Sequence, residues 1–122
     1  MNDFLRKIEE AKSISILGHM RPDGDCVGSS LGLYNYIVDN YIDKRVQVYL
    51  QEFSKDFMFL NGAPLVKHAV DEEQYDLCIV LDSGDLDRVG EFVCYFQRAK
   101  TTIRVDHGIS HIGNGDLCLV NT

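Results

Sequence analysis

An imidazole and two carboxylates lie within seven residues of one another near the start of the chain, at His19, Asp23 and Asp25. Carboxylate oxygens with a single imidazole suit Mn²⁺ or Mg²⁺ better than structural zinc, which normally recruits thiolates. Pro22 interrupts regular hydrogen bonding and Gly24 lets the backbone turn, so both carboxylates can point at one centre. The spacing therefore predicts a divalent metal site. Taken singly, each residue also has an ordinary role, since an Asp can cap a following helix and a His can lie in a turn.

The sequence around this cluster predicts a strand that leads into a helix. Residues 13–17 (SISIL) form a short apolar, β-branched run that is typical of a buried strand. Residues 26–38 carry apolar side chains at helical spacing. The cluster therefore falls on the turn between a strand and a helix.

Polar residues follow two later apolar runs in the same way. Residues 76–81 (DLCIVL) predict the most apolar strand, hence the centre of the sheet, and end before Asp82. Residues 101–105 (TTIRV) predict another strand, which ends before Asp106 and His107. Because parallel strands end at one edge of a sheet, where the ligands of open α/β sheets bind, we expect these groups to converge. The expected cluster contains His19, Asp23, Asp25, Asp82, Asp106 and His107.

The remaining pattern predicts an α/β fold with a doubly wound, mainly parallel sheet flanked by helices. A first helix begins at Asn2 or Asp3 and covers one sheet face, a strand spans residues 45–50, and a further helix spans residues 86–99. Residues 51–70 give a weak signal, with a short helical turn at FMFLNGAP.

The composition indicates a single folded domain over residues 1–122, with 45% hydrophobic and 25% charged residues. The net charge of −7 argues against binding of long duplex nucleic acid, which is held mainly by lysine and arginine on phosphates. A small phosphorylated ligand remains compatible if a divalent metal lies between it and the carboxylates. The sequence leaves the oligomeric state open, including a homodimer.

The cysteines and the N-terminus indicate a cytoplasmic protein. Cys26, Cys78, Cys94 and Cys118 lie in apolar surroundings without C-x-x-C spacing, so we expect reduced thiols in the core. The N-terminus (MNDFLRKIEE) predicts a charged amphipathic helix instead of a signal peptide. No segment reaches the roughly 20 apolar residues that span a bilayer, so no membrane association is expected.

These motifs resemble the DHH phosphoesterase superfamily, and within it the bacterial oligoribonuclease and pAp phosphatase-like proteins. The resemblance extends over nearly the whole chain and is most specific in the first motif, residues 19–25 (HMRPDGD) followed by Gly28 and Ser29. The other two motifs are Asp82 with Arg88, and Asp106 with His107. The resemblance implies a doubly wound α/β domain with a two-manganese centre that hydrolyses phosphoester or phosphoanhydride bonds.

By resemblance, His19, Asp23 and Asp82 hold one manganese ion, while Asp25, Asp82 and His107 hold the other, so that Asp82 bridges the pair. Two ions about 3.5–4 Å apart polarise the phosphoryl group and activate a water for in-line attack. Mg²⁺ is the alternative metal.

Further roles follow from the same resemblance. Asp106 would orient the neighbouring His107, and both are counted with Asp82 as catalytic residues. Arg88 and Ser29 would bind substrate. For Arg88, a pair with the Asp82 carboxylate and an ordinary surface arginine are the open alternatives.

The chain departs from the family pattern in two ways. Gly108 stands where the name-giving motif has a second imidazole, which would face the substrate phosphate. The family's fourth motif, whose Asp binds the second metal, and its C-terminal substrate-binding domain are expected to be absent from residues 1–122. We therefore expect turnover to suffer more than metal binding, with His111 as a minor candidate for compensation.

Two functions are compatible with these residues. The first is a Mn²⁺-dependent hydrolase domain for short oligonucleotides or small nucleotides such as pAp, truncated or weakly active. The second is a non-catalytic metal- or nucleotide-binding remnant. A dinucleotide-binding fold is disfavoured because no G-x-G-x-x-G turn follows the first strand.

Overall fold

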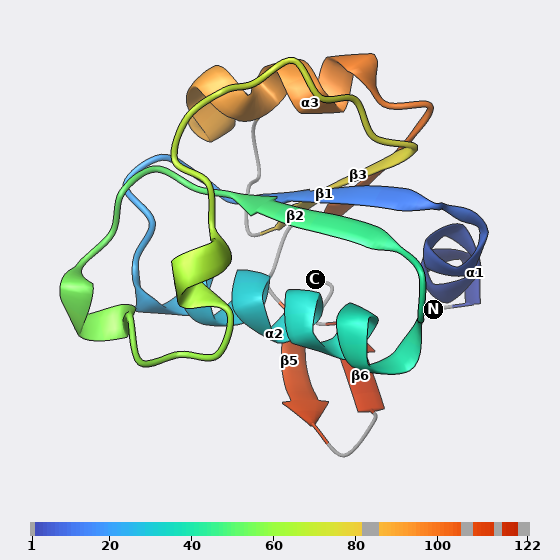
Figure 1. The fold of residues 1–122 in the computed structure, drawn as a ribbon, viewed down its shortest axis with the longest axis horizontal. Helices are drawn as coiled ribbons and strands as arrows, with labels where there is room; N and C mark the ends of the chain where they lie inside the picture. The colour runs from blue at the N-terminus through green and yellow to red at the C-terminus, as the bar shows by residue number, and fades with distance from the viewer. Residues whose placement is uncertain (1, 82–85, 106–108, 114–115, 120–122) are drawn as a thin grey trace.

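The computed structural model describes residues 2–81, 86–105, 109–113 and 116–119, with side chains described within residues 3–81 and 86–105. Four strands form one sheet in which every neighbouring pair is parallel, in the order β2-β1-β3-β4 (Figure 1). They are β1 (Ser13–Leu17), β2 (Arg45–Tyr49), β3 (Leu77–Leu81) and β4 (Thr101–Val105). The predicted α/β fold is confirmed, and each strand lies within one residue of its expected range.

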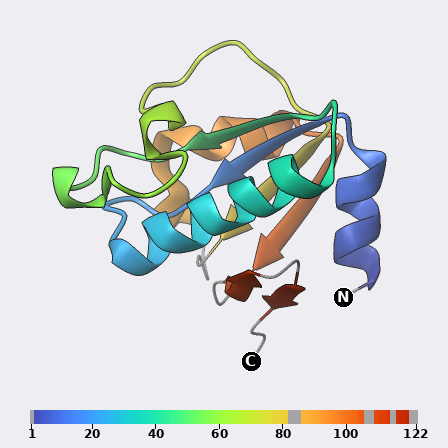
Figure 2. The ribbon, with the colours of Figure 1, turned by 60° about the horizontal axis from the view of Figure 1, so that its bottom comes forward.

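Helices cover both faces of this sheet (Figure 2). They are α1 (Asn2–Glu10), α2 (Gly24–Asn40) and α3 (Val93–Arg98). Side chains alternate along each strand, so Ile14 and Ile16 pack in a core with α1 and α2, while Leu17 and Cys78 pack in a second core with α3. All five residues of β3 are buried, which agrees with its expected central place.

The register places the carboxyl ends of three strands side by side. Leu17, the last residue of β1, pairs with Val80, and Leu81, the last residue of β3, pairs with Val105 of β4. The helix α1 lies by the amino ends of β1 and β2 (Figure 1). The segments that follow β1, β3 and β4 therefore all start from one edge of the sheet, the edge expected to carry the site.

The prediction of one helix over residues 86–99 was wrong. Two short 3₁₀ turns, together η3 (Leu86–Phe92), precede α3, and they are separated by a kink at Gly90, whose φ of +76° and ψ of −142° are not helical. A Cβ at this position would lie 2.8 Å from Met20 Cγ, so glycine lets the segment pass close to the turn after β1. The apolar residues at helical spacing still identify the side of the segment that faces the core, because Phe92 is buried.

Residues 51–70 contain two short 3₁₀ helices, η1 (Lys55–Phe57) and η2 (Ala63–Leu65), where a single helical turn was expected. Lys67 then forms a parallel bridge with Tyr49, and its N–H donates to a β2 carbonyl at 3.0 Å. The outer edge of β2 is therefore covered by the chain itself at the carboxyl end of the strand.

A hairpin that the sequence analysis missed follows the sheet. Its strands are β5 (Ile109–Gly113) and β6 (Asp116–Leu119), which pair antiparallel, and β5 lies against α2. Within the described part of the chain, no helix combines the length and the apolar character needed to cross a membrane.

Three cysteines fall among the described side chains, and all three are free thiols. Cys26 and Cys78 are buried, and Cys94 is half-buried. Burial raises the pKa of the Cys78 thiol to about 12, so this group stays protonated. These thiols behave as core residues, as expected, whereas the side chain of Cys118 lies outside the described residues.

Candidate metal centre

The turn after β1 passes close to the first turn of α2. A Cβ at Gly18 would overlap Cys26 Sγ and would lie 2.7 Å from Leu50 Cδ2, so a larger residue would force these neighbours to move. The turn leads directly to His19, which is buried with 7% of its surface exposed. The close packing of the strand, the turn and the helix therefore fixes the position of the imidazole.

The backbone fixes the orientation of the His19 ring. Nδ1 lies 2.7 Å from the Met20 carbonyl oxygen, and because a carbonyl can only accept, Nδ1 carries the hydrogen. In the neutral ring the lone pair is then on Nε2, which lies 3.8 Å from Asp23 Oδ1. Metal-binding histidines are commonly oriented in this way, through the ring nitrogen that does not bind the metal.

Asp23 is the N-cap of α2. Its Oδ1 accepts from the Cys26 N–H at 2.9 Å, which confirms the capping role that was one alternative for this residue. The capping hydrogen bond uses only part of the acceptor capacity of the carboxylate, because its two oxygens offer about four lone-pair sites. Two ligands of one ion, with bonds of about 2.0–2.2 Å, lie roughly 3–4 Å apart. The His19–Asp23 separation of 3.8 Å therefore fits a shared divalent ion.

Among the described residues, none of the other predicted metal ligands joins the His19–Asp23 pair. Asp25 is exposed in the first turn of α2. Among the side chains that the structure describes, no three His, Cys, Asp or Glu residues gather closely enough to hold an ion. Asp82, Asp106 and His107 lie outside the described residues, so their convergence with His19 stays a prediction.

The two predicted substrate-binding residues lie on different elements. Arg88 is exposed on η3, and its carbonyl oxygen accepts from the Met20 N–H at 2.6 Å, which ties η3 to the turn after β1. Ser29 is half-buried on α2. At the adjacent Gly28, no described atom lies within 4 Å of an added Cβ. The substrate-binding roles of Arg88 and Ser29 stay predictions.

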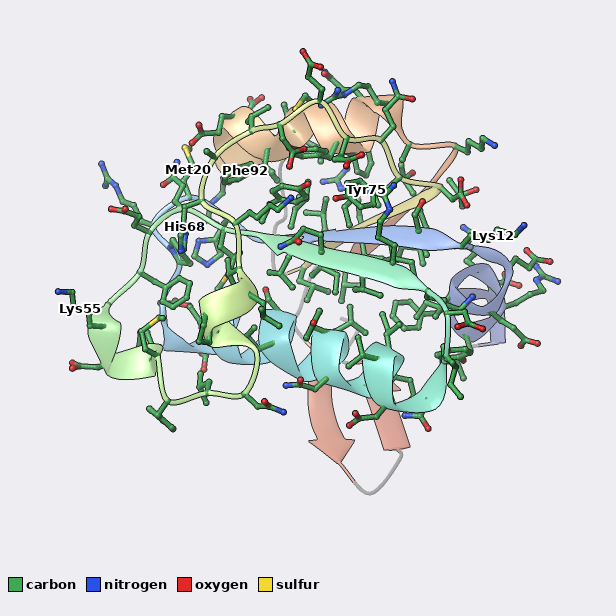
Figure 3. The ribbon with its side chains drawn as sticks, viewed as in Figure 1. Lys12, Met20, Lys55, His68, Tyr75 and Phe92 are labelled. Carbon is green, nitrogen blue, oxygen red and sulfur yellow. The ribbon has the colours of Figure 1, made fainter. Side chains whose placement is uncertain are left out.

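Arg21 is a candidate binding residue that the sequence analysis missed. Its φ of +55° is in the left-handed region, and its N–H donates to Gln51 Oε1 at 3.1 Å. Together with Met20, Gln51 and Arg88 it lines a cavity of about 580 Å³ beyond the carboxyl ends of β1 and β2. Figure 3 shows Met20 at this edge of the sheet. The available signal was a cationic side chain inside an otherwise acidic motif, directly before Pro22.

The chain is an open parallel α/β domain, and the His19–Asp23 pair lies at the carboxyl edge of its sheet, where the ligands of such folds bind. The sequence model of the DHH family, N-terminal domain, matches residues 13–119. The chain belongs to the DHH family, as its motifs predicted.

Two curated relatives and one solved structure are similar to this chain. The probable bifunctional oligoribonuclease and PAP phosphatase NrnA of Streptococcus mutans is 30% identical over 122 residues, covering 98% of this chain and 37% of the relative. The bifunctional oligoribonuclease and PAP phosphatase NrnA of Mycoplasma genitalium is 28% identical over 110 residues, covering 88% of this chain and 34% of the relative. An exopolyphosphatase-related protein from Bacteroides fragilis matches with a TM-score of 0.76 and 26% identity, over 99% of this chain and 37% of that one. The chain spans about a third of the length of these proteins.

Proposed function

We propose that this chain is the metal-binding domain of a phosphoester hydrolase that acts on short oligonucleotides or on small nucleotides such as pAp. Membership of the DHH family supports a hydrolase, and the names of the Streptococcus mutans and Mycoplasma genitalium relatives supply the substrate class. Within the structure, the observation that carries the proposal is the His19–Asp23 pair, 3.8 Å apart at the carboxyl end of β1.

Five residues would hold Mn²⁺, or Mg²⁺ in its place: His19, Asp23 and Asp82 at one position, and Asp25, Asp82 and His107 at a second. Divalent ions bound there would polarise the phosphoryl group and acidify a water molecule. The described part of the chain orients two of these residues, His19 and Asp23. A backbone carbonyl holds His19 with its lone pair on Nε2, and the helix cap holds the carboxylate of Asp23 beside it.

A non-catalytic metal- or nucleotide-binding module is the second candidate, and one residue favours it. Gly108 replaces the second imidazole expected after Asp106 and His107. A positioned proton-transfer group contributes typically about 10²–10⁴-fold to a rate. A chain without this group can bind metal and nucleotide while turning over very little.

Mn²⁺-dependent release of phosphate from pAp, and of mononucleotide from a dinucleotide, tests the proposal. We expect turnover by this chain to be barely measurable and Gly108→His alone to recover little. The same variant, joined to the segment that follows the matched region in the Streptococcus mutans relative, should recover much more. His19→Ala in the joined protein is the control and should abolish the gain.

Two results would decide between the hydrolase and the non-catalytic module. A joined Gly108→His protein that binds Mn²⁺ yet releases nothing from either substrate would contradict the hydrolase and leave the binding module. Robust turnover by the unaltered chain would show that the missing imidazole is not limiting, and would rule out the non-catalytic candidate.

A further inference from the structure

Met20 makes three separate contacts at the turn after β1. Its N–H donates to the Arg88 carbonyl oxygen at 2.6 Å, which ties the turn to η3. Its own carbonyl oxygen lies 2.7 Å from His19 Nδ1 and orients the imidazole. Its side chain lies against Gly90, where an added Cβ would be 2.8 Å from Met20 Cγ and 3.0 Å from Met20 Sδ. One residue therefore links the position of η3 to the orientation of His19.

Small molecules in solution have access to the side chain of Met20. The residue is 41% exposed and lines the cavity of about 580 Å³ at the carboxyl edge of the sheet. Figure 3 shows its side chain on the side of the sheet that carries α3. Exposed methionine thioethers are common sites of oxidation to the sulfoxide. The position of Met20 therefore joins an oxidisable sulfur to the contacts that hold the turn.

Oxidation of this sulfur by a peroxide is a two-electron step. A lone pair of the thioether attacks one peroxide oxygen, so that an S–O bond forms and the O–O bond breaks. The other oxygen leaves with the proton of the transferred one, as water from hydrogen peroxide or as an alcohol from an organic peroxide. The sulfur is oxidised, the peroxide is reduced, and an apolar side chain becomes polar and chiral. A larger and more polar group cannot keep the close contact that Met20 makes with Gly90.

Met58 provides a comparison within the same chain. It is 43% exposed, nearly the same as Met20, and it is the C-cap of η1. Its N–H donates to the Lys55 carbonyl oxygen at 3.0 Å, so this hydrogen bond joins residues of one short segment. The Met20 N–H instead joins two segments that are far apart in the sequence. An oxidant should therefore reach both sulfurs alike, while only the oxidation of Met20 affects a contact between separate segments.

We propose that Met20 is a reversible oxidation site whose sulfoxide separates η3 from the turn after β1 and releases the His19 ring from its fixed orientation. Peroxides are the oxidants, and a methionine sulfoxide reductase restores the thioether. The inference goes beyond the proposed function, because it concerns the redox state of the turn and holds whether or not the chain hydrolyses a phosphoester. Oxidation would disorganise the candidate metal pair without altering either of its residues.

Treatment of the chain with hydrogen peroxide, followed by peptide mass spectrometry, tests the modification itself. Met20 and Met58 should gain one oxygen at rates within about threefold of each other, because their exposed fractions are similar. Met20→Leu and Met58→Leu are treated in parallel, since leucine fills a similar volume and forms no sulfoxide. Peroxide also reacts with thiols, and both variants keep every cysteine of the parent, so an effect of cysteine oxidation would appear in both.

Hydrogen exchange of the amide of residue 20, followed by NMR, measures the separation of η3 from the turn. Oxidation should speed this exchange by about tenfold in the parent and in Met58→Leu, because the amide loses its acceptor, and should not change it in Met20→Leu. Amides of β3 should exchange as before, which shows that the fold is retained.

The ¹⁵N shifts of His19 at one mildly alkaline pH measure the orientation of the ring. They should report a hydrogen on Nδ1 before oxidation and a mixture of the two tautomers afterwards. Reductase treatment should restore both the exchange rate and the shifts. Met20→Gln places a polar group at the same position and should reproduce the oxidised state without peroxide, whereas Met58→Gln should behave like the parent.

Three outcomes would overturn the proposal. The first is a Met20 that stays unoxidised while Met58 reacts, which would mean that the sulfur is shielded. The second is a fully oxidised Met20 whose amide exchange and His19 shifts match those of the reduced parent. The third is an equal acceleration of exchange in oxidised Met20→Leu, which would assign the effect to another oxidised residue.

Discussion

The Tyr49 hydroxyl lies 3.0 and 3.1 Å from the two carboxylate oxygens of Asp71, so the last residue of β2 holds the loop that leads into β3. The Tyr75 hydroxyl lies 2.7 Å from that of Tyr49, and the Tyr95 hydroxyl donates to Asp71 Oδ1 at 2.8 Å. The rings of Tyr49 and Tyr95 stack with their centroids 4.1 Å apart. This network fastens the loop to β2 and to α3 at once.

The pKa of Asp71 makes the contribution of this network depend on pH. Burial acts to raise the pKa, but hydrogen bonds from Tyr95, the Glu73 amide, Lys67 and Tyr49 outweigh it and lower the pKa from 3.8 to about 2. A carboxyl whose pKa is lower in the folded state stabilises the fold above its unfolded pKa. That stabilisation is lost as the pH falls from about 4 to about 2.

Asp71→Asn should remove this pH dependence. The difference in unfolding free energy between the parent and the variant should be largest near neutral pH. It should then shrink by about 1–2 kcal/mol as the pH is lowered from about 5 to about 2. Urea unfolding of both proteins at a series of pH values measures this difference, and a difference that stays constant over the range would contradict the assignment.

Tyr95→Phe should lower the unfolding free energy by about 1–3 kcal/mol while retaining the ring that stacks on Tyr49. The loss is expected because the hydroxyl donates to Asp71 Oδ1 and also accepts from the Asp71 N–H at 2.6 Å. Tyr34→Phe is the control, since Tyr34 is half-buried and its hydroxyl makes no hydrogen bond among the described residues. Equal effects of the two substitutions in urea unfolding would mean that the hydroxyl network adds nothing to stability.

Gly18→Ala should destabilise the fold by roughly 1–3 kcal/mol, because the added Cβ would overlap Cys26 Sγ. Combining it with Cys26→Ala should cost less than the sum of the two single substitutions, since the smaller side chain makes room. Gly28→Ala is the comparison within α2, and it should stabilise by up to about 1 kcal/mol through helix propensity. Thermal unfolding measures all four variants, and strict additivity of the first pair would refute the steric explanation.

Binding of Mn²⁺ should depend more on Asp23 than on Asp25. Asp23→Asn keeps the helix cap, because an amide oxygen also accepts the Cys26 N–H, but it removes the carboxylate charge. We expect Asp23→Asn and His19→Ala each to weaken the tighter site by about tenfold or more in calorimetric or EPR titration. Asp25→Asn should affect only a second, weaker site, because Asp23 has the His19 ring 3.8 Å away, whereas Asp25 belongs to the other proposed metal position.

The control for this titration is Asp39→Asn, which removes an exposed charge near the end of α2. Two results are incompatible with the expected difference in Mn²⁺ affinity between the two sites. One is a parent chain with two equally tight Mn²⁺ sites, and the other is an Asp23→Asn variant that binds Mn²⁺ as Asp39→Asn does.

The strands could be predicted from the sequence because short aliphatic, β-branched runs are typical of strands buried on both faces, and β1 has both of its expected ends. The helix over residues 86–99 could not be predicted correctly. Its division depends on Gly90 passing close to Met20, a contact between segments far apart in the sequence, while the apolar periodicity continues through the break. The sequence analysis assigned no structure to the β5–β6 hairpin.

At the site, the sequence located His19 and Asp23 because strand, turn and helix cap follow one another directly along the chain. It did not show that Arg21 and Arg88 line one cavity. That proximity arises from the Met20–Arg88 backbone hydrogen bond and from the Gln51 side chain, which join separate segments. Ligand types can be read from a local motif, but a cavity shared between segments depends on the tertiary fold.

The hydrogen bond between the Met20 N–H and the Arg88 carbonyl joins two segments that could otherwise diverge independently during evolution. An insertion or deletion in either segment would displace the candidate metal pair together with the cavity lined by Met20, Arg21, Gln51 and Arg88. A chimera that preserves this contact would therefore have to exchange residues 18–25 and 86–92 together.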